Sequence, residues 1–209
     1  MSFIPKRIKE YKGKKALVDG IPFTLPVDAT NSPALMAIFP CDLQQSKRLL
    51  PQGIHPLRLW KNALLVVTVI DYRETTIGKY VEYSIAIACT YGKNPAPRLL
   101  PAMLPSLYKA GQYVIDLPVS SEISVKGGKG IWGMPKHQAS LDFKVTADKA
   151  SSQYDLDGKL VTYVEIVLPK KVWFPVKAKA SNYCSFRGML MRSDIFLDNK
   201  AGFNLFSKT

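Results

Sequence analysis

A lysine in an unusual setting is the residue of this chain with the clearest chemical potential. Lys136 lies at residues 130–143 in the segment GIWGMPKHQASLDF, among glycines, a proline and large apolar side chains. A lysine attacks a carbonyl only as a neutral amine, and burial in an apolar pocket disfavours the charged form. Met134 and Trp132 could line such a pocket, and His137 could add positive charge at mildly acidic pH. An exposed lysine in a turn is the alternative that ordinary burial preferences favour.

A second residue with chemical potential is Glu82, which lies in an apolar segment at residues 78–92, GKYVEYSIAIACTYG. As a strand, this segment places Glu82 on one face with Tyr80 and Ser84, and the odd-numbered residues from 81 to 87 on the other. The odd-numbered face is more apolar and is expected to face the core. Glu82 therefore points either to solvent or into a polar barrel interior.

Other chemistries find little support in the residues. The chain has only two histidines and no HExxH pattern, so no metal site is predicted. The glycines of KGGKG at residues 126–130 do not match a phosphate-binding loop, and we interpret them as a turn before the next strand. An SxxK tetrapeptide at residues 106–109 lacks the companion motifs of a serine–lysine hydrolase. Three cysteines without a CxxC pair indicate free thiols in a cytoplasmic protein.

The elements that must position these residues are mostly strands. Segments rich in β-branched and aromatic residues, separated by turn residues, predict strands at residues 33–39, 63–72, 79–91, 112–118, 139–146, 159–168 and 182–189. Asp157 and Gly158 predict a hairpin turn. The fold class expected from this pattern is mainly β (β-rich α+β), as one barrel or sandwich domain over residues 1–209.

Helical signals are few. Asp42 is a predicted N-cap, with Gln45 at the capping-box position, of a helix that reaches Leu50 and ends at Pro51. A second short helix is predicted at residues 102–109. The sequence therefore predicts one or two short helices on the outside of the β domain.

The chain of 209 residues is strongly basic, with a formal net charge of +13 at pH 7. Residues 1–15 contain six basic residues and one acid, and residues 170–192 contain six basic residues and no acid. These segments could attract nucleic acid or an anionic substrate, or form a solvated face. No nucleic-acid-binding motif accompanies them, so nucleic acid is not expected as a partner. The apolar stretch at residues 63–70 is too short to span a membrane, and we expect a cytoplasmic location.

Two segments together resemble the acetoacetate decarboxylase family. The residues GMPK at 133–136 resemble its Schiff-base lysine motif, and GKYVE at 78–82 resembles the strand that carries its pocket glutamate. The resemblance covers residues 30–145 well and the C-terminal third only by strand pattern. It implies a closed cone-like antiparallel β-barrel with Lys136 in its interior, in a protein that assembles as a homo-oligomer.

The resemblance also implies a reaction. Lys136 would form an imine with a β-keto acid, carbon dioxide would leave, and Glu82 would lie beside the carboxylate or move protons. Met134, Trp132 and His137 would contact the substrate. The reaction would need neither a metal nor an organic cofactor.

Four departures from the family pattern leave other reactions open. His137 stands where the family has a second lysine, and Ser32 stands near its arginine position. Val67 stands where the family has a further glutamate, and Lys129-Gly130 replaces an Arg-Glu pair. The family includes members that resemble aldolases and dehydratases and keep the imine lysine. The alternatives are therefore an imine-dependent aldolase or dehydratase, and an inactive barrel that binds a small ligand.

Overall fold

A computed structural model describes residues 13–98, 100–169 and 174–202 of the chain. These residues form four β-sheets and three short helices. The helices are α2 (Leu43–Leu49), α3 (Leu100–Met103) and α4 (Glu122–Trp132).

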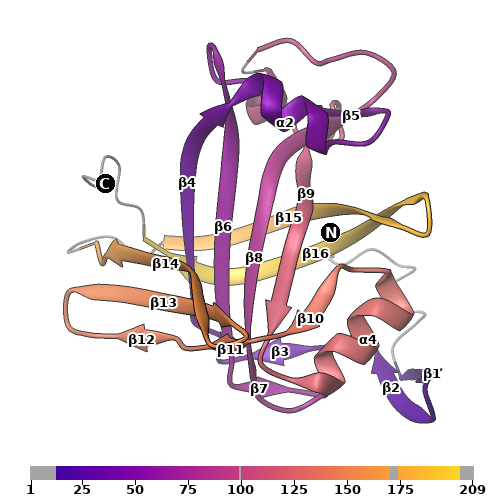
Figure 1. Ribbon diagram of the computed structural model, residues 1–209, viewed down its shortest axis with the longest axis vertical. Coiled ribbons are helices and arrows are strands. Elements are labelled where there is room, and N and C mark those ends of the chain that lie inside the picture. The colour runs from indigo at the N-terminus through magenta and orange to yellow at the C-terminus, as the bar shows by residue number, and fades with distance from the viewer. Residues whose placement is uncertain (1–12, 99, 170–173, 203–209) are drawn as a thin grey trace.

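An eight-stranded sheet forms the body of the molecule (Figure 1). Six of its strands pair in the order β16 (Met189–Ala201), β15 (Phe174–Phe186), β9 (Gly111–Val119), β8 (Tyr80–Tyr91), β6 (Asn62–Tyr72) and β4 (Ala34–Asp42). Two short strands extend it: β10 (Lys136–Gln138) pairs with β9, and β5 (Ile54–Pro56) pairs with β8. Pairing in this sheet is antiparallel except where β9 meets β10 and β15.

Three smaller sheets surround the large one. One contains β11 (Ser140–Leu141), β12 (Lys144–Val145), β13 (Lys149–Leu156) and β14 (Lys159–Val167). The other two are the pairs β1 (Lys14–Val18) with β2 (Ile21–Leu25), and β3 (Ala29–Thr30) with β7 (Glu74–Thr75).

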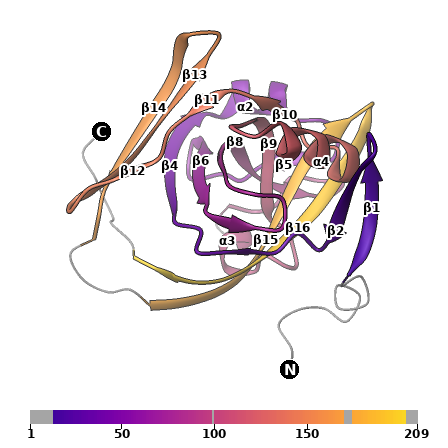
Figure 2. The same ribbon diagram turned by 90° about the horizontal axis from the view of Figure 1, so that it is seen from below.

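The large sheet is strongly bent but is not a closed barrel. β15 and β16 cross behind the other long strands in Figure 1, and Figure 2 shows the sheet curling around its interior. Gly111 permits the crossing of β9 and β15, because a Cβ there would lie 2.2 Å from the carbonyl oxygen of Ser181. β4 and β16 end the hydrogen-bonded order, and no pairing joins them among the described residues. The closed barrel expected from the resemblance is therefore not observed.

The two faces of the large sheet are covered differently. The outer face packs against β13 and β14, and its buried core consists of Leu35, Val67, Val69, Tyr83, Ala150, Tyr154 and Val164. The inner face looks toward α4, β15 and β16, and its buried core consists of Ala86, Val114, Leu117, Met134 and Cys184. Because side chains alternate along β8, Glu82 and Ser84 lie on the inner face with Ala86.

The first predicted helix is confirmed, and the second is displaced. Asp42 caps α2 as predicted, and its side chain accepts a hydrogen bond from the backbone N–H of Gln45 at 2.6 Å. α3 covers Leu100–Met103, whereas residues 104–109 form a bend and turns. Pro105 explains the difference, because proline cannot donate the hydrogen bond that would continue the helix.

Helix α4 was not predicted from the sequence. The glycines that we interpreted as a turn, Gly127, Gly128 and Gly130, lie inside this 11-residue helix. Glycine disfavours a helix, which is why the segment lacked a helical signal. Packing explains their presence, because a Cβ on any of the three would lie within 2.7 Å of a side chain of β2, β10 or β1. The expectation of a turn is therefore wrong: these glycines let a helix approach its neighbours closely.

Most predicted strands are present with shifted ends, but two predictions are wrong. The strand expected at residues 182–189 spans the turn between β15 and β16, where Arg187 and Gly188 both have positive φ. The strand expected at residues 139–146 is two short strands, β11 and β12. The hairpin turn is confirmed, with φ of 51° at Asp157 and 74° at Gly158.

Three of the four described basic residues in the C-terminal basic segment are paired with acids. Lys177 lies 3.0 Å from Asp198, while Lys179 and Arg192 both contact Asp194. The acids belong to β16, the hairpin partner of β15. This pairing leaves less free charge for a nucleic-acid footprint than the sequence suggested. Residues 1–12 and 170–173 lie outside the described residues. Of the described helices, none combines the length and apolarity needed to cross a bilayer.

Candidate active site

Lys136 is buried, with 8% of its surface exposed, so the alternative of an exposed turn lysine is wrong. The chain leaves α4 through Gly133, which has φ of 63° and caps the helix in the left-handed conformation. Three residues later it enters β10, where Lys136 pairs in register with Leu117 of β9. The glycine and the following Pro135 thus turn the chain from the helix into the sheet, with Lys136 on the inner face.

Two polar side chains hold the amine of Lys136. Its Nζ lies 2.5 Å from Oε2 of Glu82 and 2.9 Å from Oγ of Ser124. It also lies 5.4 Å from the centre of the Tyr80 ring. Of these partners, Glu82 and Tyr80 belong to one face of β8, and Ser124 belongs to α4. The structure thus joins Lys136 and Glu82, which the sequence analysis selected separately.

Helix α4 forms a wall over the lysine side chain. A Cβ on Gly128 would lie 2.3 Å from Cδ of Lys136, so the aliphatic part of the side chain lies directly against the helix backbone. Ser124 stands four residues earlier on the same helix face and is 1% exposed. One face of α4 therefore supplies both the close wall and a hydroxyl partner for the amine.

Two tyrosines border the Lys136–Glu82 pair. The rings of Tyr72 and Tyr80 stack with their centres 4.6 Å apart. Burial, and then the nearby Glu82 carboxylate, raise the pKa of both phenols above the ordinary value. A hydrogen bond with Ser124 opposes this rise in pKa for Tyr80. Both phenols therefore remain neutral at physiological pH and can act as neutral hydrogen-bonding groups beside the pair.

His137 lies on the opposite side of the sheet from Lys136. Its Nε2 is 2.7 Å from Oδ1 of Asp116 and 3.4 Å from the hydroxyl of Tyr154, which belongs to the outer-face core. Alternation along β10 explains this placement, because adjacent side chains point to opposite faces. The structure therefore does not bring His137 to the amine.

Met134 and Trp132 belong to the inner-face core. Met134 is buried with Leu117, the register partner of Lys136, and Trp132 packs against the same cluster. These side chains provide apolar surroundings on the inner face. The polar contacts of Lys136 come instead from Glu82 and Ser124.

Sequence reasoning missed Ser124 and Gly128, because both depend on α4. Tyr80 could have been predicted as a neighbour of the site, since it precedes Glu82 by two residues and must share its strand face. Nothing in the linear order of the chain marks Ser124 as a partner of Lys136.

A family model described as acetoacetate decarboxylase matches residues 9–184 of the chain. The chain belongs to the acetoacetate decarboxylase family. No curated protein sequence matches it.

Solved structures of acetoacetate decarboxylases share the fold. The enzyme from Legionella pneumophila gives a TM-score of 0.59 at 15% identity, covering 76% of this chain and 58% of that chain. A second acetoacetate decarboxylase structure gives the same TM-score and identity and is covered over 59% of its length. The present chain therefore spans less than two thirds of these two family structures.

A structure of MppR, an enduracididine biosynthesis enzyme complexed with pyruvate, is also similar. It gives a TM-score of 0.53 at 13% identity, covering 84% of this chain and 77% of that chain. At these identities the similarity shows a common fold.

At one departure from the family pattern, the side chain lies on the face opposite to Lys136. Val67, at the expected position of a family glutamate, belongs to the outer-face core. Among the described residues, Glu82 is the carboxylate in contact with Lys136.

Proposed function

We propose that this protein is a Schiff-base-forming lyase that decarboxylates a β-keto acid through an imine on Lys136. The contact between Lys136 and Glu82 carries the proposal, because it places an amine and a proton acceptor together in a buried site. Membership of the acetoacetate decarboxylase family supports it.

The first step requires a neutral amine. Transfer of a proton from Lys136 to Glu82 across their 2.5 Å contact would provide it. The amine nitrogen then attacks the ketone carbon to give a carbinolamine. Return of the proton from Glu82 to the hydroxyl of that adduct releases water and leaves a protonated imine. Ser124, 2.9 Å from Nζ, would help to hold the nitrogen during these steps.

The second step uses the imine as an electron sink. The bond between the α-carbon and the carboxylate breaks, carbon dioxide leaves, and the electron pair moves toward the imine nitrogen to form an enamine. Protonation of the enamine carbon and hydrolysis of the resulting imine release the ketone and restore the amine. Glu82 is the proposed proton carrier, because it is the carboxylate in contact with Lys136.

The inner face supplies a candidate surface for the rest of the substrate. Thr68 pairs in register with Ser84, so both side chains lie on this face, about 7 Å along β8 from Glu82. The buried hydroxyl of Thr68 has no hydrogen-bond partner in the described structure. An unpaired hydroxyl is costly, and a polar substrate group is a suitable partner for it. Met134 and Trp132 are the proposed apolar neighbours.

Substrate access to this face is proposed from the β4 side. Met36, whose register partner on β6 is Thr68, is 54% exposed, and Ile38 beside it is 56% exposed. Apolar residues at this rim favour a substrate with an apolar portion larger than a methyl group. Assembly into a homo-oligomer, which the family resemblance implies, is also part of the proposal.

An imine-dependent aldolase or dehydratase is the second candidate function. Two observations favour it: a family second lysine is replaced by His137, and His137 points away from the amine. MppR has been solved with pyruvate, a keto acid without a β-carboxylate, and binding of such a keto acid is compatible with an imine on Lys136. An inactive protein of this fold that binds a small ligand remains the alternative without chemistry.

Product analysis separates these functions. The protein is incubated with a panel of β-keto acids, and separately with pyruvate and an aldehyde, and both carbon dioxide and new carbon–carbon bonds are measured. Decarboxylation that is lost in Lys136→Ala and kept in Lys129→Ala supports the lyase. A condensation product without carbon dioxide would transfer the assignment to the aldolase. Absence of both products from the folded protein would contradict both enzymatic candidates.

A further inference from the structure

A separate cavity lies at the end of the large sheet farthest from Lys136. It has a volume of about 420 Å³ and is lined by Gln52, Gly53, Tyr91, Gly92, Lys93 and Lys109. Tyr91 ends β8, and Glu82 lies nine residues before it, so about 30 Å of strand separates the cavity from the proposed active site. Figure 1 shows this end of β8 beside β5 and α2, away from α4 and β10.

The walls of the cavity are fixed by the backbone. Ile54 pairs with Tyr91 in the register of β5 and β8, and the N–H of Gly92 donates to the carbonyl of Gly53 at 3.0 Å. Gly53 has φ of 83°, and a Cβ there would lie 3.4 Å from the Tyr91 ring. The two walls are thus joined before any ligand binds.

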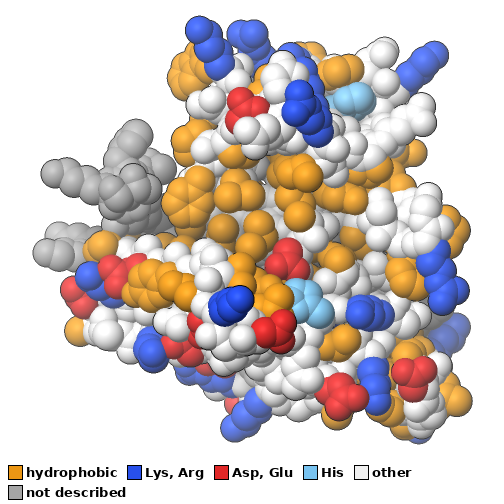
Figure 3. Space-filling view, in the orientation of Figure 1, with side chains coloured by type: hydrophobic (Ala, Val, Ile, Leu, Met, Phe, Trp, Pro, Cys, Tyr) orange, Lys and Arg blue, Asp and Glu red, His pale blue; other side chains and the backbone are white. Residues whose placement is uncertain are grey.

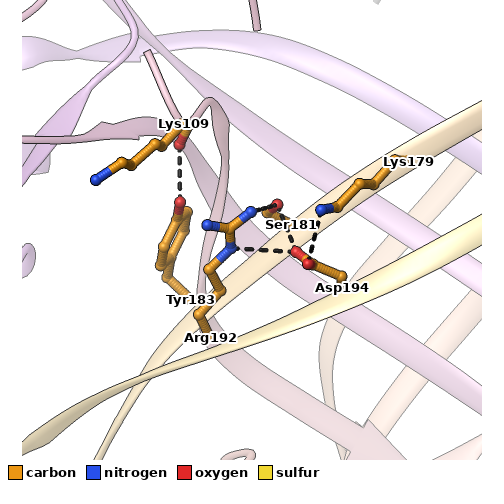
Figure 4. A network of polar contacts seen from close by, with 6 residues as sticks. All are labelled: Lys109, Lys179, Ser181, Tyr183, Arg192 and Asp194. Atoms are coloured by element: carbon orange, nitrogen blue, oxygen red, sulfur yellow. Dashed lines mark hydrogen bonds and ion pairs between the residues drawn. The ribbon is translucent and has the colours of Figure 1, made fainter. Parts of the chain in front are cut away.

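Lys109 is presented toward this cavity by a constrained backbone. It has φ of 47°, a conformation that a lysine seldom adopts, and its carbonyl accepts a hydrogen bond from the Tyr183 hydroxyl at 2.8 Å. Its Nζ lies 4.9 Å from the centre of the Tyr91 ring. Figure 4 shows this Nζ pointing away from Tyr183 and Arg192. The hydrogen bond from Tyr183 thus holds the backbone of Lys109, while the ammonium group of Lys109 extends toward the cavity.

The basic side chains of the cavity lack the acidic partners that those of the β15–β16 hairpin have. Figure 4 shows Lys179 and Arg192 both in contact with Asp194. Among the described residues, no ion pair with a carboxylate is formed by Lys93 or Lys109. The cavity lining contains these two ammonium groups and the amide of Gln52, but no acid.

The surrounding chain increases this positive potential. Residues 43–61 and 92–110 meet at this end of the sheet and contain seven basic residues and no acidic residue. The basic residues are Lys47, Arg48, Arg58, Lys61, Lys93, Arg98 and Lys109. Figure 3 shows Lys and Arg side chains gathered at this end of the molecule, where Asp42 caps α2. A concave site whose lining contains cations and no acid attracts anions, and it concentrates them more than a flat surface does.

We propose that this cavity binds the phosphate group of a small molecule between Lys93 and Lys109. Two ammonium groups match the charge of a phosphate dianion better than that of a single carboxylate, and Gln52 adds a neutral hydrogen-bond donor. The volume is that of a small-molecule site, so a free organic phosphate fits better than a membrane surface. The site is independent of the proposed imine chemistry at Lys136.

Isothermal titration with inorganic pyrophosphate, at constant ionic strength, tests the proposal. We expect one saturable site per chain, with affinity weakened about tenfold or more in Lys93→Ala and in Lys109→Ala. Lys61→Ala removes an exposed charge from the same end of the sheet without altering the cavity lining, and it should change the affinity less than about twofold. Thermal unfolding of each variant confirms that it is folded.

Two further measurements separate this proposal from the lyase proposal and from lipid binding. Lys136→Ala should bind pyrophosphate like the unchanged protein, so failure of the lyase proposal would not affect this one. Vesicles of phosphatidylcholine with phosphatidylglycerol test a lipid phosphate as the source. Binding to these vesicles without binding to pyrophosphate would overturn the proposal. Equal losses of pyrophosphate affinity in all three single lysine variants at this end would also overturn it, since they would indicate a diffuse charge effect.

Discussion

The Nζ of Lys136 lies 2.5 Å from Oε2 of Glu82, although 54 residues separate the two in the chain. The side chains of both residues are largely buried, at 10% and 14% exposure. A buried charge that loses its partner is strongly destabilising, whereas replacing both members of a pair with suitable neutral groups is much less costly. The stability of the fold and the proposed reaction therefore depend on the same two side chains.

Removing one member of this pair should cost more stability than removing both. We expect Glu82→Gln and Lys136→Met each to lower the free energy of unfolding by about 3 kcal/mol. The double variant should be more stable than the sum of the two losses predicts, because no uncompensated charge remains. Urea unfolding of the four proteins measures this coupling. Strictly additive losses would show that the two side chains do not interact in solution.

A methyl group on Gly128 should disturb Lys136 directly. Its Cβ would lie 2.3 Å from Cδ of the lysine, so Gly128→Ala must displace either the lysine or the helix. We expect a loss of about 1–3 kcal/mol in stability, despite the higher helix propensity of alanine, and slower imine formation. Lys129→Ala is the matched control on the exposed side of α4. Faster or unchanged imine formation in Gly128→Ala would argue against the close wall.

The hydroxyl of Thr68 should contribute to substrate binding at a cost in stability. It is buried without a partner in the described structure, so Thr68→Val should stabilise the fold by about 1 kcal/mol. The same change should raise KM for the keto acid while leaving the reactivity of Lys136 in place. Steady-state kinetics and urea unfolding on one preparation measure both effects. An unchanged KM would remove Thr68 from the proposed substrate surface.

Tyr80 should make the protein sensitive to alkaline pH. Burial and Glu82 raise the pKa of its phenol above the ordinary value of 10.0, so the folded state holds this proton more tightly than the unfolded state. Its contribution to stability is complete below pH 10 and decreases as pH rises above that value. Tyr80→Phe should therefore lose less stability than the unchanged protein between pH 10 and 11. Parallel pH dependences in the two proteins would show that Tyr80 does not contribute.

The sequence singled out both residues of the Lys136–Glu82 contact but not the geometry that joins them. The strand alternation of β8 placed Glu82 on the face opposite to the apolar residues, and that face is the inner one. It could not exclude solvent exposure, because the covering element, α4, was interpreted as a turn. Its glycines weaken the local helical signal, and only the close approach of Phe23, Lys136 and Val18 in the folded structure explains why they are needed.

The sequence also suggested His137 as a substrate contact because it is adjacent to Lys136 in the chain. In a strand, adjacency places side chains on opposite faces, and the structure shows His137 beside Asp116 instead. The extent of barrel closure was unpredictable for a different reason. It depends on whether the end strands β4 and β16 pair with each other, a tertiary contact that strand patterns do not encode.

Trapping of the imine tests the central claim most directly. The protein is incubated with acetoacetate, other β-keto acids and pyruvate, then reduced with borohydride and digested for mass spectrometry. We predict a reduced adduct on Lys136 that is absent in Lys136→Ala and retained in Lys129→Ala. Folded protein that gives no adduct with any keto acid, or an adduct on exposed lysines alone, would contradict the assignment of Lys136 as the nucleophile.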